Sequence, residues 1–328
     1  MIEDIFKNTI AQNSLLKKKD KIILGVSGGP DSVFMLYQFF YLKKEYKLQL
    51  ACAHFNHSLR KEADQEEIFI NELCHKLEIP YICEKKDVKS FFNGDSLEQT
   101  ARILRYDFFL KTARQLKFKK LALGHHKDDL VETILMRLIR GTGLKGLRGF
   151  LPKTRYKALT VIRPLIETTK KDIESWLKKQ KIDYCIDKSN FEEKFFRNRI
   201  RLKLLPLLKE YNPNIVDTLC NLAKTIAYDY ELIQTVSLEH YNLLKKRETK
   251  REIFLDLAGL NQATPALFNN VLRITIEQLQ GHTRRLEARH LDEVRDLALN
   301  RPGESVVDLP NLKVKKSQNF LIIQALLL

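Results

Sequence analysis

The segment SGGPDS at residues 27–32 combines residue types that bind phosphate groups. Its two glycines let successive backbone N–H groups turn toward one point, and its two serines add hydroxyl donors. The apolar run 21–26 predicts a buried strand before it, and residues 30–43 predict a helix whose N-terminus carries partial positive charge. Neither a Walker A nor a G-x-G-x-x-G pattern is present. The segment therefore predicts a different nest for phosphate or pyrophosphate. The alternative is a plain strand–helix turn that uses glycine for its geometry.

Two histidines and an asparagine follow the next apolar run of the chain. That run, 48–55, predicts a second strand, and His54, Asn56 and His57 lie at its end. Polar side chains gathered beside an anion nest favour a ligand pocket. The alternative is that these histidines are packed in the core, and His125 has the same two interpretations.

Two arginines lie three residues apart in a predicted helix. Arg102 and Arg105 therefore share one helix face. Arg102 is the preferred phosphate contact, because a guanidinium can bind phosphate through two parallel hydrogen bonds. The alternative for Arg102 is a surface salt bridge with Glu98, one turn earlier.

A pair of carboxylates has the same helical spacing. Asp129 and Glu132 face one way, so the pair could bind a metal ion, or it could hold a substrate ammonium group and help to remove its proton during attack. Asp128 points to another side of the helix and is expected to cap it or to face solvent. Asp31 is a candidate for organising Mg²⁺ on phosphate groups, where charge neutralisation is the main demand.

Strands and helices alternate along the first part of the chain. Strands are predicted at 21–26, 48–55, 81–85 and 119–124, and helices at 30–43, 62–78, 96–115 and 128–140. This order predicts an α/β fold with a doubly wound parallel sheet. Ligands bind such sheets beyond the carboxyl ends of the strands, which is where the phosphate segment, His54 and Gly124 lie.

The alternation fades after Pro164. Helices are predicted at 169–181, 198–209, 213–245, 264–280 and 288–299, and short strands at 305–309, 312–316 and 320–325. The charged cluster 245–252 is interpreted as a boundary. We therefore expect a catalytic nucleotide-binding domain at 1–210, a connecting helix at 211–249 and a small α/β domain at 250–328.

The length and the charge of the chain indicate how many domains it has and what kind of partner it binds. The 328 residues suffice for two domains, and 57 basic against 41 acidic side chains give a net charge of +16. This excess favours a polyanionic partner such as nucleic acid; the alternative is a generally lysine-rich proteome. Residues 145–210 alone hold 18 basic and 8 acidic side chains.

Other sequence features bear on the compartment. No signal peptide or membrane span is expected, and the five cysteines form no CxxC pair. We therefore expect a protein of the reducing cytoplasm, without a disulfide framework, a zinc knuckle or a CxxC sulfur carrier.

The SGGPDS segment resembles the loop of the PP-loop ATP pyrophosphatases, which cleave ATP between its α and β phosphates and adenylate a carbonyl oxygen. Further segments narrow the resemblance: HFNHSLR at 54–60, EQTAR at 98–102, GHHKDDLVET at 124–133, RGTG at 140–143, RPL at 163–165, DKSN at 187–190 and RNRIR at 197–201. In this order they resemble the tRNA(Ile)-lysidine synthetases. The resemblance is dense across 20–210 and looser across 211–328.

The resemblance implies an ATP-dependent ligase acting on isoleucine tRNA with a CAU anticodon. The ε-amine of free L-lysine would replace the adenylated oxygen at C2 of the wobble cytidine, with release of pyrophosphate and AMP, so that the tRNA reads AUA instead of AUG. The family's corresponding acids hold lysine. A homodimer and a short form with one C-terminal domain are also implied, whereas a membrane partner is not.

The expected site residues follow from the motifs and the resemblance together. The expected ATP and pyrophosphate contacts are Ser27, Gly28, Gly29, Pro30, Asp31, Ser32, His54, Asn56, His57, Gly124 and His125. The expected catalytic residues are Asp31, Asp129, Glu132 and Arg102, with Asp129 and Glu132 binding lysine and Asp31 binding Mg²⁺. The expected tRNA contacts are Arg197, Arg199, Arg201, Arg284, Arg285 and Arg289, with Phe195 or Phe196 available to stack on a base.

Three other functions compete with this interpretation. A PP-loop tRNA thiolase would need a sulfur-carrying cysteine pair, which the spacing does not offer. A PP-loop amide synthetase for a small metabolite would not need the basic stretch. An RNA-binding protein with an inactive nucleotide fold would not need an intact SGGPDS segment.

Overall fold

The computed structural model describes residues 1–328 except 59–62, 92–96, 188–191, 284 and 327–328. The chain divides into two compact units, Met1–Ile226 and Ala227–Leu328. Helix α10 (Ile215–Leu244) begins in the first unit and ends in the second. The division therefore falls inside the segment that the sequence predicts as a connecting helix.

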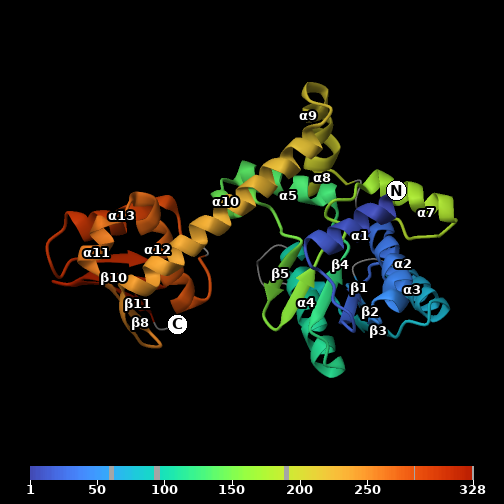
Figure 1. The fold of residues 1–328 in the computed structure, drawn as a ribbon, viewed down its shortest axis with the longest axis horizontal. Helices are drawn as coiled ribbons and strands as arrows, with labels where there is room; N and C mark the ends of the chain where they lie inside the picture. Colours follow the sequence, from blue (N-terminus) through green and yellow to red (C-terminus); the bar gives the residue numbers. More distant parts are fainter. Residues whose placement is uncertain (59–62, 92–96, 188–191, 284, 327–328) are drawn as a thin grey trace. The chain divides into compact units, whose positions relative to one another are not determined.

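The first unit contains a six-stranded sheet in the order β3-β2-β1-β4-β6-β5 (Figure 1). Its strands are β1 (Lys21–Gly25), β2 (Gln49–Asn56), β3 (Tyr81–Lys85), β4 (Lys120–Leu123), β5 (Lys153–Tyr156) and β6 (Leu159–Ile162). All neighbours pair in parallel except β5, which is antiparallel to β6. The predicted α/β fold is confirmed. The β5–β6 hairpin was not predicted, because each of its strands has only four residues.

Helices cover both faces of this sheet. Successive side chains of a strand point to opposite faces, and here both sets are apolar and need to be buried. The helical elements of the unit are α1 (Ile2–Gln12), α2 (Pro30–Glu45), α3 (Ala63–Lys76), η1 (Val88–Phe91), α4 (Leu97–Leu116), α5 (Lys127–Arg140), α6 (Leu144–Leu147), α7 (Lys170–Gln180), α8 (Phe196–Arg199), the π-helical segment η3 (Ile200–Leu204) and α9 (Leu205–Tyr211). Ile22 and Leu24 pack on one face with α2, whereas Ile23 packs on the other with α4.

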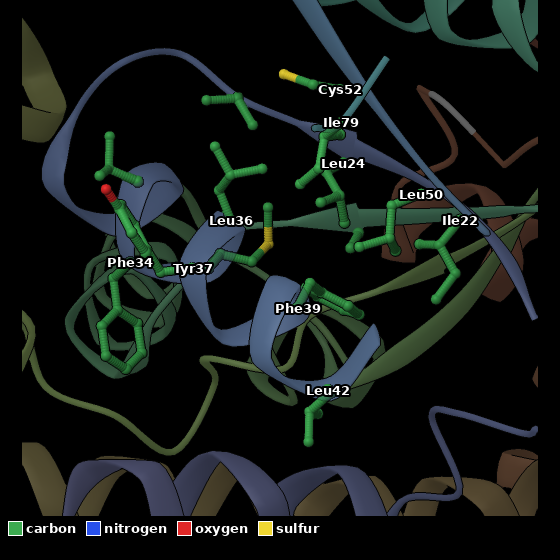
Figure 2. Close-up of a cluster of buried hydrophobic side chains, with 14 of the residues drawn as sticks. Ile22, Leu24, Phe34, Leu36, Tyr37, Phe39, Leu42, Leu50, Cys52 and Ile79 are labelled. Carbon is green, nitrogen blue, oxygen red and sulfur yellow. The ribbon is translucent and has the colours of Figure 1, made fainter. Parts of the chain in front are cut away.

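Figure 2 shows the core on the α2 side of the sheet. Phe34 and Phe39 of α2 belong to the same buried cluster as the strand residues Ile22 and Leu24. Phe34 also meets Trp176 of α7 edge to face, with ring centroids 4.9 Å apart. This packing fixes the start of α2, and with it the phosphate segment, relative to β1.

The second unit is an antiparallel sheet covered by helices on one face. Its elements are β7 (Lys245–Glu248), β8 (Glu252–Asp256), α11 (Leu257–Gln262), α12 (Pro265–Gln280), α13 (Ala288–Leu299), β9 (Val306–Leu309), β10 (Leu312–Lys316) and β11 (Phe320–Ala325), with strand order β7-β8-β11-β10-β9. The predicted helices at 264–280 and 288–299 and the three final strands are confirmed. The predicted boundary at 245–252 is wrong, because this segment forms β7 and the start of β8. Ile253 and Leu255 anchor the hairpin in the core of the unit.

Two further findings bear on the sequence-based exclusions. Among the described residues, no helix is long and apolar enough to cross a membrane. All five cysteines are free thiols.

The packing of Phe34 predicts a large effect of its removal. We expect Phe34→Ala to lower the free energy of unfolding of the first unit by about 3–5 kcal/mol, because it leaves a cavity under α2. Trp176 is the chain's one tryptophan and contacts Phe34, so its fluorescence during urea unfolding follows this unit. Ile68→Ala, at an exposed position of α3, is the control and should change stability by less than about 0.5 kcal/mol. Equal effects of the two substitutions would contradict the proposed packing.

Candidate functional site

A cavity of about 590 Å³ lies at the carboxyl ends of β1, β2 and β4. This size suits a ligand such as a nucleotide. The structure gathers most of the predicted site residues in its wall: Ser27, Gly29, Pro30, Asp31, Ser32, His54, Asn56, His57, Gly124, His125, Asp129, Arg197 and Arg201.

The phosphate segment takes a conformation that needs glycine at its second position. Gly28 has φ +84°, and its carbonyl accepts a hydrogen bond from the Cys185 N–H at 2.9 Å. A Cβ at this position would lie 3.3 Å from the Cys185 sulfur. Gly28 therefore determines the shape of the loop without being part of the described cavity wall. Any other residue there would be strained.

Ser32 closes the phosphate loop on itself. Its buried hydroxyl accepts from the Ser27 N–H at 3.1 Å and donates to the Gly29 carbonyl at 2.9 Å. The Ser32 hydroxyl proton is therefore already used inside the loop. Gly29 is the N-cap of α2, so the N-terminus of that helix follows directly.

The two polar residues at the end of β2 have different roles. The His54 Nδ1 lies 2.9 Å from the Val26 carbonyl, so it carries the ring proton. The Nε2 of His54 is then an acceptor in the cavity wall, and it has no hydrogen-bond partner among the described residues. Asn56 instead donates to Asp64 and Glu67 of α3, at 3.1 and 2.9 Å, which ties the strand end to that helix.

His125 lies in the cavity wall and also packs against Phe150, with ring centroids 5.3 Å apart. Burial is the main cause that lowers its pKa, to about 3. The ring is therefore neutral at physiological pH. Both interpretations of this histidine hold in part, since it contacts an aromatic residue and lines the cavity.

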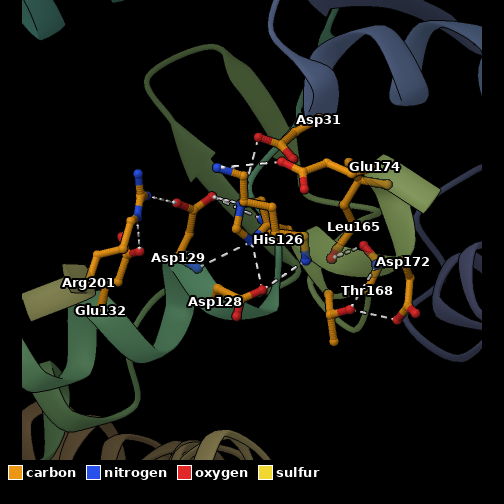
Figure 3. A network of polar contacts seen from close by, with 12 residues as sticks. Asp31, His126, Asp128, Asp129, Glu132, Leu165, Thr168, Asp172, Glu174 and Arg201 are labelled. Atoms are coloured by element: carbon orange, nitrogen blue, oxygen red, sulfur yellow. Dashed lines mark hydrogen bonds and ion pairs between the residues drawn. The ribbon is translucent and has the colours of Figure 1, made fainter. Parts of the chain in front are cut away.

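His126 is surrounded by three carboxylates (Figure 3). Its Nε2 lies 3.6 Å from Asp31 and 3.5 Å from Asp129, and its Nδ1 lies 3.5 Å from Asp128. Burial lowers the pKa of His126, but these carboxylates outweigh burial and raise it to about 9. The ring is 2% exposed and is charged at neutral pH. A charged ring has no free lone pair with which to cap α5. The Asp129 carboxylate caps the helix instead, because it accepts a hydrogen bond from the backbone N–H of His126 at 3.1 Å.

The carboxylates around His126 differ in pKa. Burial raises the pKa of Asp31 to about 6, although His126 opposes the rise. Burial acts in the same direction on Asp129, but the charges of His126 and Arg197 outweigh it and lower the pKa to about 2. Asp128 accepts a hydrogen bond from the Lys170 N–H at 2.9 Å, so it caps α7 instead of its own helix.

Two arginines neutralise the predicted carboxylate pair. Arg197 donates to Glu132 and to Asp129, both at 2.6 Å, and Arg201 donates to Glu132 at 2.6 Å. Glu132 is 1% exposed and lies beneath these guanidinium groups. Arg197 and Arg201, which the sequence predicts as tRNA contacts, lie against the acids, because a buried carboxylate needs a partner. Their contact with tRNA stays a prediction.

The neighbouring residues of that segment face outward or pack. Arg199 is exposed, and its guanidinium lies 5.5 Å from the Phe196 ring, whereas Phe196 packs against a buried cluster. Phe195 is 43% exposed. One of the two phenylalanines is thus available to stack on a base, as the sequence analysis allowed.

The structure favours a different arginine for the phosphate contact than the one that the sequence predicts. Arg105 lines the cavity, and its buried Nε has no partner among the described residues. Arg102 is exposed, with its guanidinium 5.0 Å from the Tyr106 ring, and is not part of the described cavity wall. The helix rotation set by buried Tyr106 turns Arg105 inward, so the expected contact moves from Arg102 to Arg105.

The predicted C-terminal contacts lie in the second unit. Arg285 and Arg289 are exposed, and the Arg289 Nε lies 2.9 Å from the Glu287 carboxylate. Arg284 lies outside the described residues.

Comparison with known proteins identifies both units. The PP-loop domain family matches residues 2–208, and the TilS substrate binding domain matches residues 255–322. The tRNA(Ile)-lysidine synthase of Petrotoga mobilis is 32% identical over 98% of this chain and 97% of its own length. That of Clostridioides difficile is 31% identical over 98% of this chain and 70% of its own. The chain belongs to the tRNA(Ile)-lysidine synthase family. The resemblance inferred from the motifs is confirmed.

A solved structure supports the fold of the first unit. The U34-tRNA thiolase NcsA from Methanococcus maripaludis superimposes with a TM-score of 0.59, over 69% of this chain and 77% of its own, at 18% identity. At that identity the likeness shows the fold alone.

Several wall residues of this lysidine synthase family member were not predicted. They are Lys170 and Glu174 of α7, Tyr184 and Cys185 after it, and His126. The sequence predicts a helix at 169–181, but the approach of α7 to the cavity depends on tertiary packing. His126 offered a signal that was not used, since it lies two and three residues before Asp128 and Asp129.

The charge on His126 predicts a pH-dependent contribution to stability. Its pKa is raised on folding from 6.5 to about 9, so its stabilising effect is complete below pH 6.5 and is lost as the pH rises through about 9. The difference in unfolding free energy between the wild type and His126→Gln should therefore shrink by about 3 kcal/mol across this range. Urea unfolding at several pH values measures it. His75→Gln, at an exposed site on α3, is the control, and a His126 difference that is constant with pH would contradict the charged ring.

Proposed function

We propose that this chain joins the ε-amine of free lysine to C2 of the wobble cytidine in isoleucine tRNA with a CAU anticodon, using ATP. Family membership supports the reaction class. The observation that carries the proposal is that the phosphate loop and Asp129 line one cavity, so that an activated base and an ammonium group can meet there. Glu132 lies behind the wall, where it accepts hydrogen bonds from Arg197 and Arg201. The product would read AUA instead of AUG.

The first half of the reaction activates the base. The C2 carbonyl oxygen of cytosine attacks the α-phosphorus of ATP, and pyrophosphate leaves toward the loop at residues 27–32. Backbone N–H groups of the loop and the N-terminus of α2 stabilise the phosphate charge. The Arg105 guanidinium, whose Nε has no described partner, supplies a further cation at the same cavity.

Mg²⁺ fits this arrangement as an ion held mainly by substrate. The Asp31 Oδ1 is buried and has no hydrogen-bond partner among the described residues, so it offers one ligand. The described residues include no group of three or more side chains that could hold a metal ion. Mg²⁺ often takes its remaining ligands from phosphates and water. Bound there, it would neutralise charge on the leaving pyrophosphate.

The second half of the reaction uses the carboxylate pair. The ε-amine of lysine attacks C2, and AMP leaves with the former carbonyl oxygen. Because the pKa of Asp129 is about 2, this group suits holding an ammonium ion more than accepting its proton. Two guanidinium groups already engage the pair, so we expect one of these contacts to break when lysine binds.

The direct test measures lysine incorporation. Purified protein is incubated with ATP, Mg²⁺, radiolabelled lysine and transcribed isoleucine CAU tRNA, with methionine CAU tRNA as the control. We expect acid-stable incorporation into the isoleucine tRNA alone. Release of AMP and pyrophosphate with another acceptor, and no lysine incorporation, would contradict the lysidine assignment.

Sedimentation velocity of the same preparation tests the predicted homodimer.

The role of the carboxylate pair predicts a selective loss. Asp129→Asn should lower the rate of lysine incorporation about 100-fold or more, because the ammonium group loses its charged partner. Tight ATP binding should persist, since the phosphate loop lies on a different strand end. Asp107→Asn, at an exposed position on α4, is the matched control and should retain full activity. Equal activity of both variants would show that Asp129 does not hold lysine.

A further inference from the structure

A second group of arginines lies outside the cavity wall, near β5. The Arg102 guanidinium is 5.0 Å from the Tyr106 ring, and that ring meets the Tyr156 ring of β5 with centroids 4.6 Å apart. We call Arg102 of α4, Arg137 of α5 and Arg148, which directly follows α6, the arginine cluster. Arg102 is exposed, and Arg137 and Arg148 are half-buried. None of the three belongs to the described wall of the cavity. The cluster therefore forms a separate surface of the first unit.

Backbone contacts hold this surface next to the cavity. Arg137 donates to the carbonyls of Gly146 and Gly149, at 3.0 and 2.8 Å. Arg163, which directly follows β6, donates to the Leu151 carbonyl at 2.8 Å. Residues 149–151 are thus fixed between two arginines.

An aromatic bridge joins the same segment to the cavity. The Arg163 guanidinium lies 5.3 Å from the Phe150 ring, and that ring also meets His125 of the cavity wall, with ring centroids 5.3 Å apart. Phe150 therefore links the cluster to the site where the base reacts.

The electrostatics of the cluster favour an anionic ligand. Burial lowers the pKa of Arg137, and the charged groups that lower it further are Arg148 and Arg102. Arg102 acts in the same direction on Arg105 and Arg163. Like charges held together create a positive potential that concentrates polyanions. A guanidinium also matches the geometry of a phosphate better than an ammonium does.

The surface beside the cluster is open. Residues 138–145 are all exposed, and they include Arg140 and Lys145. A Cβ added at Gly141 or Gly143 would meet no atom within 4 Å. A large ligand can therefore reach the cluster without rearrangement of this segment.

We propose that the arginine cluster binds phosphodiester groups of the tRNA that flank the nucleotide inserted into the cavity. The inference rests on the proposed function, because it assumes that an RNA loop presents its base there. The phosphates of ATP are assigned to the loop after β1, which lines the cavity, whereas none of the three cluster arginines belongs to that described wall. Single-stranded RNA loops with splayed bases are bound in this manner, with the backbone held by cations beside a base pocket.

The test compares two double variants with the same loss of charge. Arg102→Gln with Arg148→Gln alters the cluster and leaves Arg137, which holds two backbone carbonyls, in place. Lys21→Gln with Lys44→Gln is the matched control, since both lysines are exposed, Lys21 at the amino end of β1 and Lys44 in the last turn of α2, and neither lines the cavity. Filter binding of isoleucine CAU tRNA is measured from low to high salt, and ATP binding is measured separately.

We expect the cluster variant to bind tRNA about tenfold more weakly at low salt, because charge-assisted hydrogen bonds are lost. The slope of log affinity against log salt should become shallower by about 0.7 for each lost phosphate contact. Affinity for ATP should match that of the control. The single variants Arg102→Gln and Arg148→Gln should each show part of the change, and thermal unfolding of each checks its fold.

Three outcomes separate the possible failures. An affinity and salt slope equal to those of the control would overturn the proposed tRNA contact. A loss confined to ATP binding would assign the cluster to the nucleotide's phosphates and would also overturn it. A wild-type protein that incorporates no lysine contradicts the proposed function itself, independently of the variants.

Discussion

The site depends on keeping two carboxylates ionised in the interior of the first unit. Removing one partner from a buried ion pair typically destabilises a protein by about 3–5 kcal/mol, so the charges of Glu132 and Asp129 need lasting compensation. Arg197 and Arg201 supply it from a segment 65 or more residues away in the chain. Their contacts draw α8 and η3 onto α5. The same charges that define the reaction site therefore also close one side of its cavity.

The parts of the fold that follow from local patterns could be predicted from the sequence. The alternation of apolar runs and helical segments is sufficient to predict the parallel sheet, because buried parallel strands have few other sequence signatures. The conformation at Gly28 follows from the same kind of local rule, since a strand–helix turn around a ligand requires a positive φ. The position of Asp129 at the cavity follows from its place in the first turn of a helix after a strand.

The remaining features depend on choices that local patterns leave open. Helical spacing places Arg102 and Arg105 on one face, but the packing of Tyr106 decides which of them turns inward. The charge of Arg197 is compatible with RNA or with a carboxylate, and only the tertiary fold shows that Asp129 lies 2.6 Å away. The β7–β8 hairpin was missed for a similar reason, since its charged residues face away from the core that Ile253 fills.

The three titratable groups around His126 show how one environment assigns different roles. Burial acts on all of them, yet it dominates only at Asp31, whose pKa rises to about 6 although His126 and Lys170 oppose the rise. Asp129 is held near 2 by His126 and Arg197 together. Groups whose environments separate their pKa values are suited to separate tasks. Asp129 thus remains a fixed negative charge, as its proposed role toward an ammonium group requires, whereas the charge of Asp31 can change close to neutral pH.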